Sequence, residues 1–302
     1  MRFFKVTNID FMKTRKIWYS ISTAIIILGI LGMFVKGVKL GIDFTGGTEL
    51  IFRFQDAPEI SDVRNSMQEI GYDGSEIKTF GNKNDILIRV PDQSSNNTIV
   101  DNVQVGLEKT FKNNPITLLK KYKISPKISG ELRANAMWAI FFTLLIIMIY
   151  VAFRFKFIYG FSGVTALLHD VVATFVVIVF LEGTSSYFNL EISQSVIAAF
   201  LTLIGFSIND TVVVFDRIRE NEKIHRGESL YNVINKSVNE TLSRTIITNG
   251  TVFLVLLVLV IFGGEVNRGF ALTFFIGSIF GTYSSIYIAS AIVYDWSLRK
   301  KK

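Results

Sequence analysis

Long apolar runs, separated by shorter polar stretches, account for most of this 302-residue chain. A hydrocarbon core of about 30 Å takes about 20 apolar residues of helix to cross. Six runs meet that requirement and predict a polytopic α-helical membrane protein with six transmembrane helices. The runs are Ile17–Val35, Ala134–Phe153, Phe157–Leu181, Gln194–Phe215, Thr245–Phe262 and Phe270–Tyr294.

The first run follows Lys13, Arg15 and Lys16, as the apolar part of a secretory signal does. Its apolar stretch is longer than a usual signal core, and no small-residue cleavage site follows it. We therefore expect a retained anchor at residues 17–36, after an N-terminal segment at residues 1–16.

A different pattern fills residues 37–132, between the first and second apolar runs. Alternating apolar and polar residues indicate strands there, and apolar residues at helical spacing indicate helices. The order strand, helix, strand, strand, helix, strand predicts an extracytoplasmic α+β ferredoxin-like domain. The strands are expected at Glu49–Phe54, Ile77–Phe80, Asp85–Val90 and Tyr122–Ile128, and the helices at Ile60–Ile70 and Thr98–Phe111.

The remaining residues, 133–302, hold the other five apolar runs, a polar loop at residues 216–244 and a basic C-terminal tail. Leu230, Val233, Ile234 and Val238 recur at helical spacing inside that loop. This spacing predicts a short amphipathic helix at the membrane surface. A plain connector packed on the membrane face is the alternative interpretation.

The mean hydropathy of +0.41 supports the membrane class. The residues behind the net charge of +7 are distributed unevenly among the loops. Lysine and arginine gather at both termini, at Arg154 and Lys156 and in the loop 216–244, whereas the two opposite short loops contain only Arg268. Positive residues favour the cytoplasmic side. We therefore expect a multi-pass topology with both termini in the cytoplasm, and no nucleic-acid partner.

Composition also restricts the chemistry. The chain has no cysteine, two histidines and no phosphate-binding glycine loop of the nucleotide hydrolases. Thiolate sites, disulfides and multi-histidine metal sites are thereby disfavoured. We expect no enzyme activity, no metal and no cofactor, and a gradient or a partner as the source of any energy.

Ionisable residues inside apolar runs are costly, by about 2.5–3.5 kcal/mol on insertion scales, and usually functional. Asn209 and Asp210 lie in the fourth run, with Asp210 about 9 Å inside the interface expected at Asp216. Arg244 enters the fifth run from the same side. A buried carboxyl favours its neutral form and a nearby guanidinium its charged form. Asp210 and Arg244 are therefore candidates for ion coupling, with a purely structural ion pair as the alternative.

Two further motifs attract weaker functional hypotheses. His169 and Asp170, near the middle of the third run, could join Asp210 in one polar cluster, although a satisfied packing network is the favoured interpretation. Gly277 and Gly281 form a small-xxx-small motif that indicates helix packing.

An external-junction motif follows the first run, with paired glycines that are typical of turns. Its residues of interest are Gly41, Asp43, Phe44, Gly46 and Gly47.

Taken together, these motifs resemble the signature set of the SecF members of the SecD/SecF family, in the resistance-nodulation-division superfamily. The motifs occur in the expected order and cover most of the membrane part. They are GIDFTGGT at 41–48, HD at 169–170, GFSINDTVVVFDRIREN at 205–221, LSRTIIT at 242–248 and FGGEVNRGF at 262–270.

The resemblance implies a subunit of the bacterial protein-export machinery, located in the bacterial cytoplasmic (inner) membrane. Such a subunit pairs with SecD, associates with the SecYEG channel and with further insertion factors, and uses the proton motive force to complete preprotein translocation after the ATP-driven step. It also implies that Asp210 and Arg244 take part in ion coupling. Two other functions stay open: half of a small-molecule or lipid exporter of the same superfamily, and a non-energised membrane assembly factor.

Overall fold

The computed structural model describes residues 7–91, 98–184 and 190–299, and the chain divides into two compact units. A helical unit contains residues 1–38, 138–190 and 195–302, and a sheet unit contains residues 39–137 and 191–194. Residues 1–6 and 300–302, with part of the expected basic termini, lie outside the described residues.

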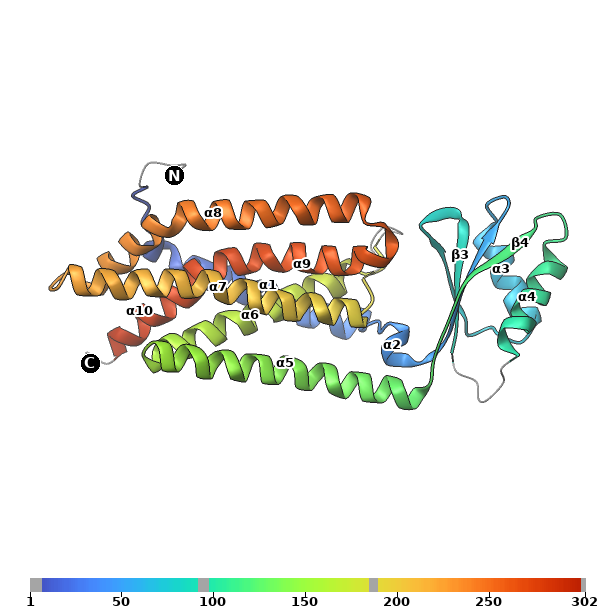
Figure 1. The fold of residues 1–302 in the computed structure, drawn as a ribbon, viewed down its shortest axis with the longest axis horizontal. Helices are drawn as coiled ribbons and strands as arrows, with labels where there is room; N and C mark the ends of the chain where they lie inside the picture. The colour runs from blue at the N-terminus through green and yellow to red at the C-terminus, as the bar shows by residue number, and fades with distance from the viewer. Residues whose placement is uncertain (1–6, 92–97, 185–189, 300–302) are drawn as a thin grey trace. The chain divides into compact units, whose positions relative to one another are not determined.

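Six helices in the described residues are long and apolar enough to cross a membrane, and Figure 1 shows them as the helical part of the chain. The third apolar run forms a helix with the expected bounds, and the other helices extend beyond their apolar runs by one or more turns. Five of the helices are α1 (Phe11–Lys36), α5 (Pro126–Arg154), α6 (Phe157–Leu181), α7 (Gln194–Ile224) and α8 (Leu230–Phe262).

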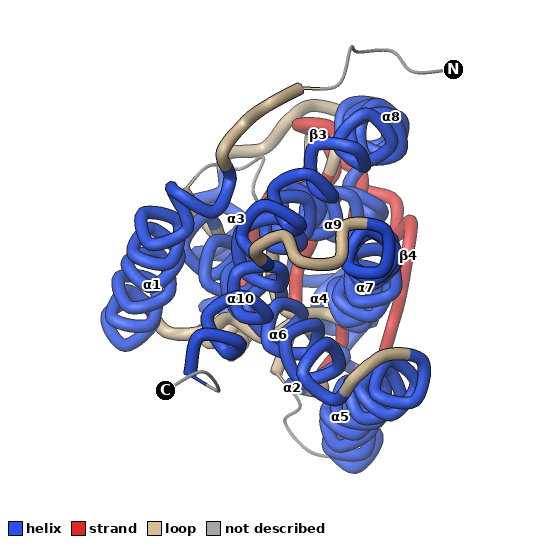
Figure 2. Tube along the Cα trace, turned by 90° about the vertical axis from the view of Figure 1, so that its left-hand side faces the viewer, coloured by secondary structure: helices blue, strands red, loops and turns tan. Residues whose placement is uncertain are grey.

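The sixth crossing helix is built from three consecutive pieces. These are α9 (Gly264–Ser284), a π-helical turn η1 (Ser285–Ala289) and α10 (Ser290–Arg299). This helix is the most buried of the six, whereas α1 and α5 are the most exposed. Figure 2, which views the helices end on, likewise shows α9 and α6 inside and α1 at the margin.

Helices α7 and α8 form a tight hairpin where the sequence predicts a long loop. Only residues 225–229 separate the two helices, so most of residues 216–244 is helical. Arg217 Nε donates to Glu240 Oε2 at 2.6 Å, and Asn221 Nδ2 donates to Ser237 Oγ and Glu240 Oε2 at 3.0 and 2.8 Å. The predicted separate surface helix is wrong: its apolar residues belong to the first turns of α8, where Val233, Ile234 and Val238 are buried.

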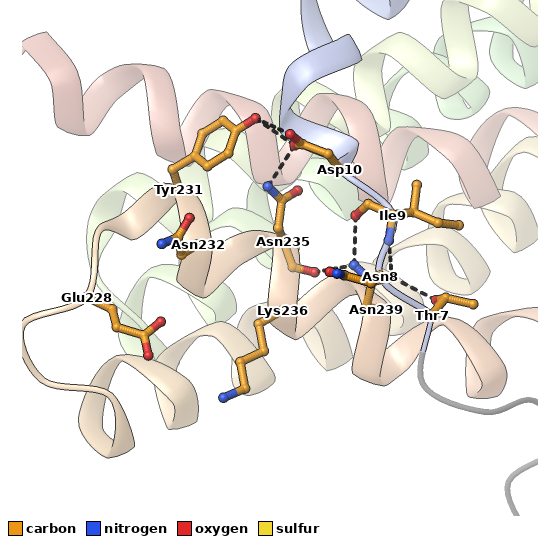
Figure 3. Close-up of a pocket in the computed structure, with 10 residues that line it drawn as sticks. All are labelled: Thr7, Asn8, Ile9, Asp10, Glu228, Tyr231, Asn232, Asn235, Lys236 and Asn239. Carbon is orange, nitrogen blue, oxygen red and sulfur yellow. Dashed lines mark hydrogen bonds between the residues drawn. The ribbon is translucent and has the colours of Figure 1, made fainter.

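The segment before α1 is held against the first turns of α8, beside an open polar pocket (Figure 3). Asn239 accepts from the backbone N–H of Ile9 at 2.9 Å and donates to its carbonyl at 2.8 Å. The Tyr231 hydroxyl and the Asn235 amide both donate to Asp10, which caps α1 by accepting from the N–H of Lys13. Helix α1 therefore begins at Phe11, six residues before its apolar run, because Asp10 supplies the cap.

The sheet unit contains a four-stranded antiparallel sheet in the order β2-β3-β1-β4, the strand order of a ferredoxin-like fold. Helices α3 and α4 pack on one face of the sheet, over a core that includes Leu50, Phe52 and Ile88. The elements are α2 (Ile42–Thr45), β1 (Gly47–Phe54), α3 (Ile60–Glu69), β2 (Glu76–Phe80), β3 (Asn82–Val90), α4 (Ile99–Thr110) and β4 (Ile116–Ile124).

The last strand lies earlier than the sequence predicts. The expected range was Tyr122–Ile128, but β4 ends at Ile124 and Pro126 is already the first residue of α5. Ser125 precedes that helix, and its side chain accepts from the N–H of Ile128 at 3.4 Å. Proline lacks an N–H for a sheet ladder but suits the first helical position, so it ends the strand.

Candidate ion-coupling site

Asp170 is the centre of one buried polar network in the helical unit. Its carboxylate is 1% exposed and accepts from the hydroxyls of Ser207 on α7 and Ser284 on α9, at 2.6 and 2.8 Å. His169 Nδ1 lies 3.0 Å from the other carboxylate oxygen. Because each oxygen has at least one polar partner, this acid is well satisfied.

The Asp170 network continues through His169 to the first helix. His169 Nε2 is hydrogen-bonded to the Tyr283 hydroxyl at 2.8 Å, and that hydroxyl is 3.0 Å from Ser22 Oγ on α1. Side chains from α1, α6, α7 and α9 are thus joined by one chain of hydrogen bonds. The pair predicted from HD in the third span is the middle of this network.

Asp210 on α7 has a different environment. It is 8% exposed, and one carboxylate oxygen accepts from Thr245 Oγ1 on α8 at 2.9 Å. Among the described residues its other oxygen, Oδ2, is buried without a hydrogen-bond partner. One turn after Thr245, Asn249 donates to Thr282 Oγ1 at 2.9 Å. Its own Oδ1 is buried and likewise has no partner within residues 7–91, 98–184 and 190–299. Asp210 is therefore only half satisfied.

The surroundings of the two acids are linked through α7 and the π turn. Thr211, next to Asp210, shares a 2.7 Å hydrogen bond with Ser285, the first residue of η1. The preceding residue, Ser284, donates to Asp170. Two consecutive serines at the start of the π turn therefore contact different sites: Ser284 bonds to Asp170, and Ser285 bonds to Thr211 beside Asp210. Such π turns occur frequently at functional sites.

Close packing of α9 on α7 depends on the small-xxx-small motif. A Cβ atom on Gly281 would lie 3.1 Å from Ser207 Cβ and 3.6 Å from Asp170 Oδ2, and one on Gly277 would overlap Leu203. Glycine at these positions lets the helix backbones approach. The motif thus explains why a serine of α7 and one of α9 meet at the same carboxylate.

Arg244 and Asn209 are exposed, unlike the buried acids. Arg244 is exposed on α8 and, in the described part of the chain, forms no ion pair with Asp210. It lines an open pocket with Asp216, Arg217 and Glu240, towards the hairpin end of α7 and α8. Asn209 is exposed on α7. The single cluster expected from the sequence is therefore two neighbouring acid sites, with a polar pair on the outer surface of the helices.

The external-junction motif lies in the sheet unit. Ile42–Thr45 form the one-turn helix α2, in which Phe44 is buried. Gly46 ends this turn at φ 75° and Gly47 begins β1 at φ 124°, backbone conformations that favour glycine. The turn interpretation of these glycines agrees with that geometry, and the contacts of Gly41 and Asp43 are considered below.

Several polar residues of the site were not singled out from the sequence. They are Ser22, Thr245, Asn249, Thr282, Tyr283, Ser284 and Ser285. A usable signal was present: Thr245 and Asn249 are spaced four residues apart in an apolar run, which places both on one helix face.

The comparisons with known proteins agree with the motifs. The family model "Protein export membrane protein SecD/SecF, C-terminal" matches residues 104–299, and the SecD/SecF GG motif model matches residues 31–58. The chain belongs to the SecD/SecF family. It is similar to "Protein translocase subunit SecF" of Rhodothermus marinus, with 39% identity over 99% of this chain and 96% of that protein. The SecF subunit of Haemophilus influenzae is 36% identical over 97% of this chain and 87% of its own length.

Among solved structures, the chain resembles SecDF of Thermus thermophilus, described as a translocon-associated membrane protein. The TM-score is 0.84 and the identity 36%, over 97% of this chain. This family member spans only 39% of that longer SecDF chain. With six long apolar helices and these relatives, the chain is a multi-pass membrane protein of the Sec export family.

Proposed function

We propose that this chain is the SecF-type half of a SecD–SecF pair, which uses the proton gradient to complete preprotein movement through SecYEG after the ATP-driven step. The pair acts in the bacterial cytoplasmic membrane with both termini of this chain in the cytoplasm, and as a coupling subunit rather than an enzyme. The single observation that carries the proposal is the buried, half-satisfied carboxyl of Asp210.

The reason is energetic. A negative charge among apolar helices is stable only when it is compensated. Among the described residues, Asp210 accepts from one hydroxyl and forms no ion pair. A proton on Oδ2 would remove the charge and create a donor. The buried Oδ1 of Asn249 on α8, which has no partner in the part of the chain that the structure describes, would be an acceptor for it. Gain and loss of that proton would therefore change the bonding between α7 and α8.

Arg244 gives this change a direction. The residue before Thr245 carries a permanent positive charge, and a shift of α8 that brings it nearer would favour the charged carboxylate. One proton crossing 100 mV supplies about 2.3 kcal/mol, enough to bias two conformations that differ by a few kcal/mol.

The exposed polar residues support the pairing with SecD. Asn209 and Arg244 lie on the outer surface of helices that otherwise suit lipid, where unpaired polar groups are costly. A second six-helix chain packed there would cover them. The greater length of the similar SecDF chain supports the same arrangement, because this chain spans 39% of it.

The test uses vesicles that contain SecD, SecYEG and this chain, with a preprotein halted after ATP is exhausted. A pH or a sodium gradient is then imposed, and completion is measured by protease protection. Asp210→Asn, which keeps the shape of the side chain, is expected to reduce the gradient-dependent rate to that of vesicles without a gradient. Glu131→Gln, which alters an exposed acid on α5 outside the Arg244 pocket, is the control and is expected to retain stimulation.

Three outcomes contradict the proposal. Full stimulation of Asp210→Asn, with SecD still co-purifying, removes coupling through this residue and favours an assembly factor. Response to sodium alone replaces the proton by sodium. Flux of a small molecule without SecYEG favours an exporter.

A further inference from the structure

Two short segments of the sheet unit, far apart in sequence, are bonded into one element that we call the joint: residues 39–45 and 191–194. The Gly41 N–H donates to the carbonyl of Ile192 at 2.8 Å, and the Ile192 N–H donates to that of Lys39 at 3.0 Å. Leu40 and Ile192 thereby form a parallel β-bridge. The joint begins with a backbone ladder, which does not depend on side-chain identity.

Gly41 makes the ladder sterically possible. A Cβ atom on this residue would lie 3.2 Å from the Cβ of Ser193 and 3.3 Å from the carbonyl oxygen of Ile192. Both contacts are tighter than side chains normally make, and one is with backbone that cannot rotate away. The first glycine of the external-junction motif is therefore favoured by close approach rather than by a turn.

Asp43 connects the joint to a helix that enters the helical unit. Its Oδ2 accepts from the backbone N–H of Gln194, the first residue of α7, at 2.8 Å. The first N–H groups of a helix lack partners within the helix, and a carboxylate satisfies them and suits the positive end of the helix dipole. The cap of α7 is thus supplied by a residue 151 positions earlier in the chain.

Glu191 fastens the same segment to the sheet through buried charges. Its two oxygens accept from Lys78 Nζ on β2 and Arg89 on β3, both at 2.7 Å, and Arg89 also donates to Glu49 on β1 at 2.9 Å. Burial alone would raise the pKa of Glu191, but the two cations outweigh it and hold the pKa below its ordinary value. The residue stays charged and bonded to two strands.

We propose that the joint is a rigid coupling between α7 and the sheet unit, with Asp43 as the positioning residue that fixes the first turn of α7. This inference rests on the proposed function, because α7 also carries Asp210, sixteen residues after Gln194 and about 24 Å along the same uninterrupted helix. A tilt or axial shift of α7 caused by protonation reaches its first turn, and the joint passes it to the three strands that Glu191 and Arg89 connect.

The first experiment separates capping from charge. In the vesicle assay, Asp43→Ala is expected to lower gradient-dependent completion about fivefold, the equilibrium factor typical of losing one N-cap. Asp43→Asn keeps an oxygen that can accept from Gln194 and is expected to restore the rate to within about twofold. Asp56→Ala is the matched control, because in the described residues Asp56 contributes only backbone hydrogen bonds, to Asn114.

These variants are compared at equal co-purification of SecD, so that misassembly is counted separately. Full activity of Asp43→Ala overturns the inference, and so does an Asp43→Asn variant as slow as Asp43→Ala. If wild type itself shows no gradient stimulation, the proposed function fails instead, and the two failures are distinguishable.

The second experiment tests whether the backbone hydrogen bonds of the joint must break during gradient-dependent translocation. The natural chain has no cysteine, so a Leu40→Cys/Ile192→Cys pair gives one possible disulfide, and neighbours on adjacent strands are near bonding distance. We expect the oxidised pair to form readily and to leave gradient-dependent completion equal to that of the reduced pair. Loss of activity on oxidation that a reductant reverses would show that the joint must open, and failure of the disulfide to form would contradict the geometry.

Discussion

Both the sheet unit and the helical unit bury acidic side chains, but the negative charge is compensated differently in the two units. Glu191 is met by two cations at 2.7 Å and its pKa lies below the ordinary value. Asp210 is met by one hydroxyl and keeps an oxygen without a partner in the described residues. Compensation thus separates an acid that stabilises the sheet unit from the acid for which we propose proton exchange.

Asp170 lies between these extremes and sharpens the comparison. It has no lysine or arginine partner in the described residues, yet Ser207, Ser284 and His169 occupy its oxygens. Burial inside a membrane helix does not by itself mark a coupling residue. The number of donors around each carboxylate is the better criterion, and it can be tested one residue at a time.

The largest loss of stability is expected for Glu191→Ala. The change removes two charge-assisted hydrogen bonds, from Lys78 and from Arg89, and leaves these cations with Glu49 and Glu76 as their remaining partners. We expect a cost of about 4 kcal/mol. Hydrogen exchange of the β2 and β3 amides, measured on the full chain in detergent, should report it. The control is Glu108→Ala on an exposed face of α4, expected within about 0.5 kcal/mol of wild type. Equal losses of stability for the two variants would mean that Glu191 stabilises the sheet unit no more than an exposed acid does.

Asp170→Ala is expected to follow, with a loss of about 3 kcal/mol in the free energy of unfolding. The change removes the acceptor of the Ser207 and Ser284 hydroxyls and the hydrogen-bond partner of His169 Nδ1, all in a buried site. Thermal denaturation of the purified chain, with Asp210→Ala in parallel, is the measurement. Asp210→Ala removes only one hydrogen bond, so a larger loss of stability for Asp210→Ala than for Asp170→Ala would contradict the comparison of the two acids.

Gly281→Ala tests the packing that creates the Asp170 network. The new methyl group would meet Ser207 at 3.1 Å, so α7 and α9 must separate slightly, at a cost of about 2 kcal/mol. Gly250→Ala on α8 has open space around it and serves as the control. A wild-type melting temperature for Gly281→Ala would show that the two helices do not need this close approach.

Asp210→Asn is expected to change stability by less than about 1 kcal/mol, because an amide oxygen can still accept from Thr245. The same variant is expected to lose gradient-dependent completion. Unfolding curves and the vesicle assay on one preparation would reveal this dissociation of stability from function. A large loss of stability would instead assign Asp210 a structural role like that of Glu191.

The smallest effect is expected from pH near neutrality. The Arg53 guanidinium, which hydrogen-bonds to Asp85, holds the pKa of Asp85 below its ordinary value, and the pKa of Glu191 is lowered as well. The stability that these acids give is fully present above their ordinary values of 3.8 and 4.5. It is lost as pH falls through the lowered values of the folded state. Stability of the sheet unit that fell on mild acidification, well above 4.5, would contradict this assignment.

Much of the architecture follows from hydropathy, as α6 shows, because a lipid-spanning helix must be apolar over its whole length. The α7–α8 hairpin escaped prediction since its polar residues, Arg217 and Glu240 among them, look like a solvated loop in sequence and pair only across two helices. The end of β4 was misplaced because alternation continues past Ile124, whereas Pro126 decides the boundary.

The buried acids could also be predicted, because a carboxyl is conspicuous in an apolar run. Their surroundings could not: the spacing of Thr245 and Asn249 indicates a shared helix face, but only the rotation of α8 in the folded chain brings Thr245 into hydrogen-bond distance of Asp210. The Gln194 cap by Asp43 joins residues 151 positions apart, and no local pattern signals such a contact.

The hairpin bonds have a consequence for how the length of this chain can vary. Arg217 with Glu240, and Asn221 with Ser237, set the axial register of α7 against α8 and thereby the depth of Asp210 relative to Thr245. Insertions at residues 225–229 would lengthen the turn and leave that alignment intact. A single residue added between Arg217 and Asn221 would rotate the rest of α7 by about 100° about its axis. The Arg217–Glu240 and Asn221–Ser237 hydrogen bonds could then no longer form at the same time.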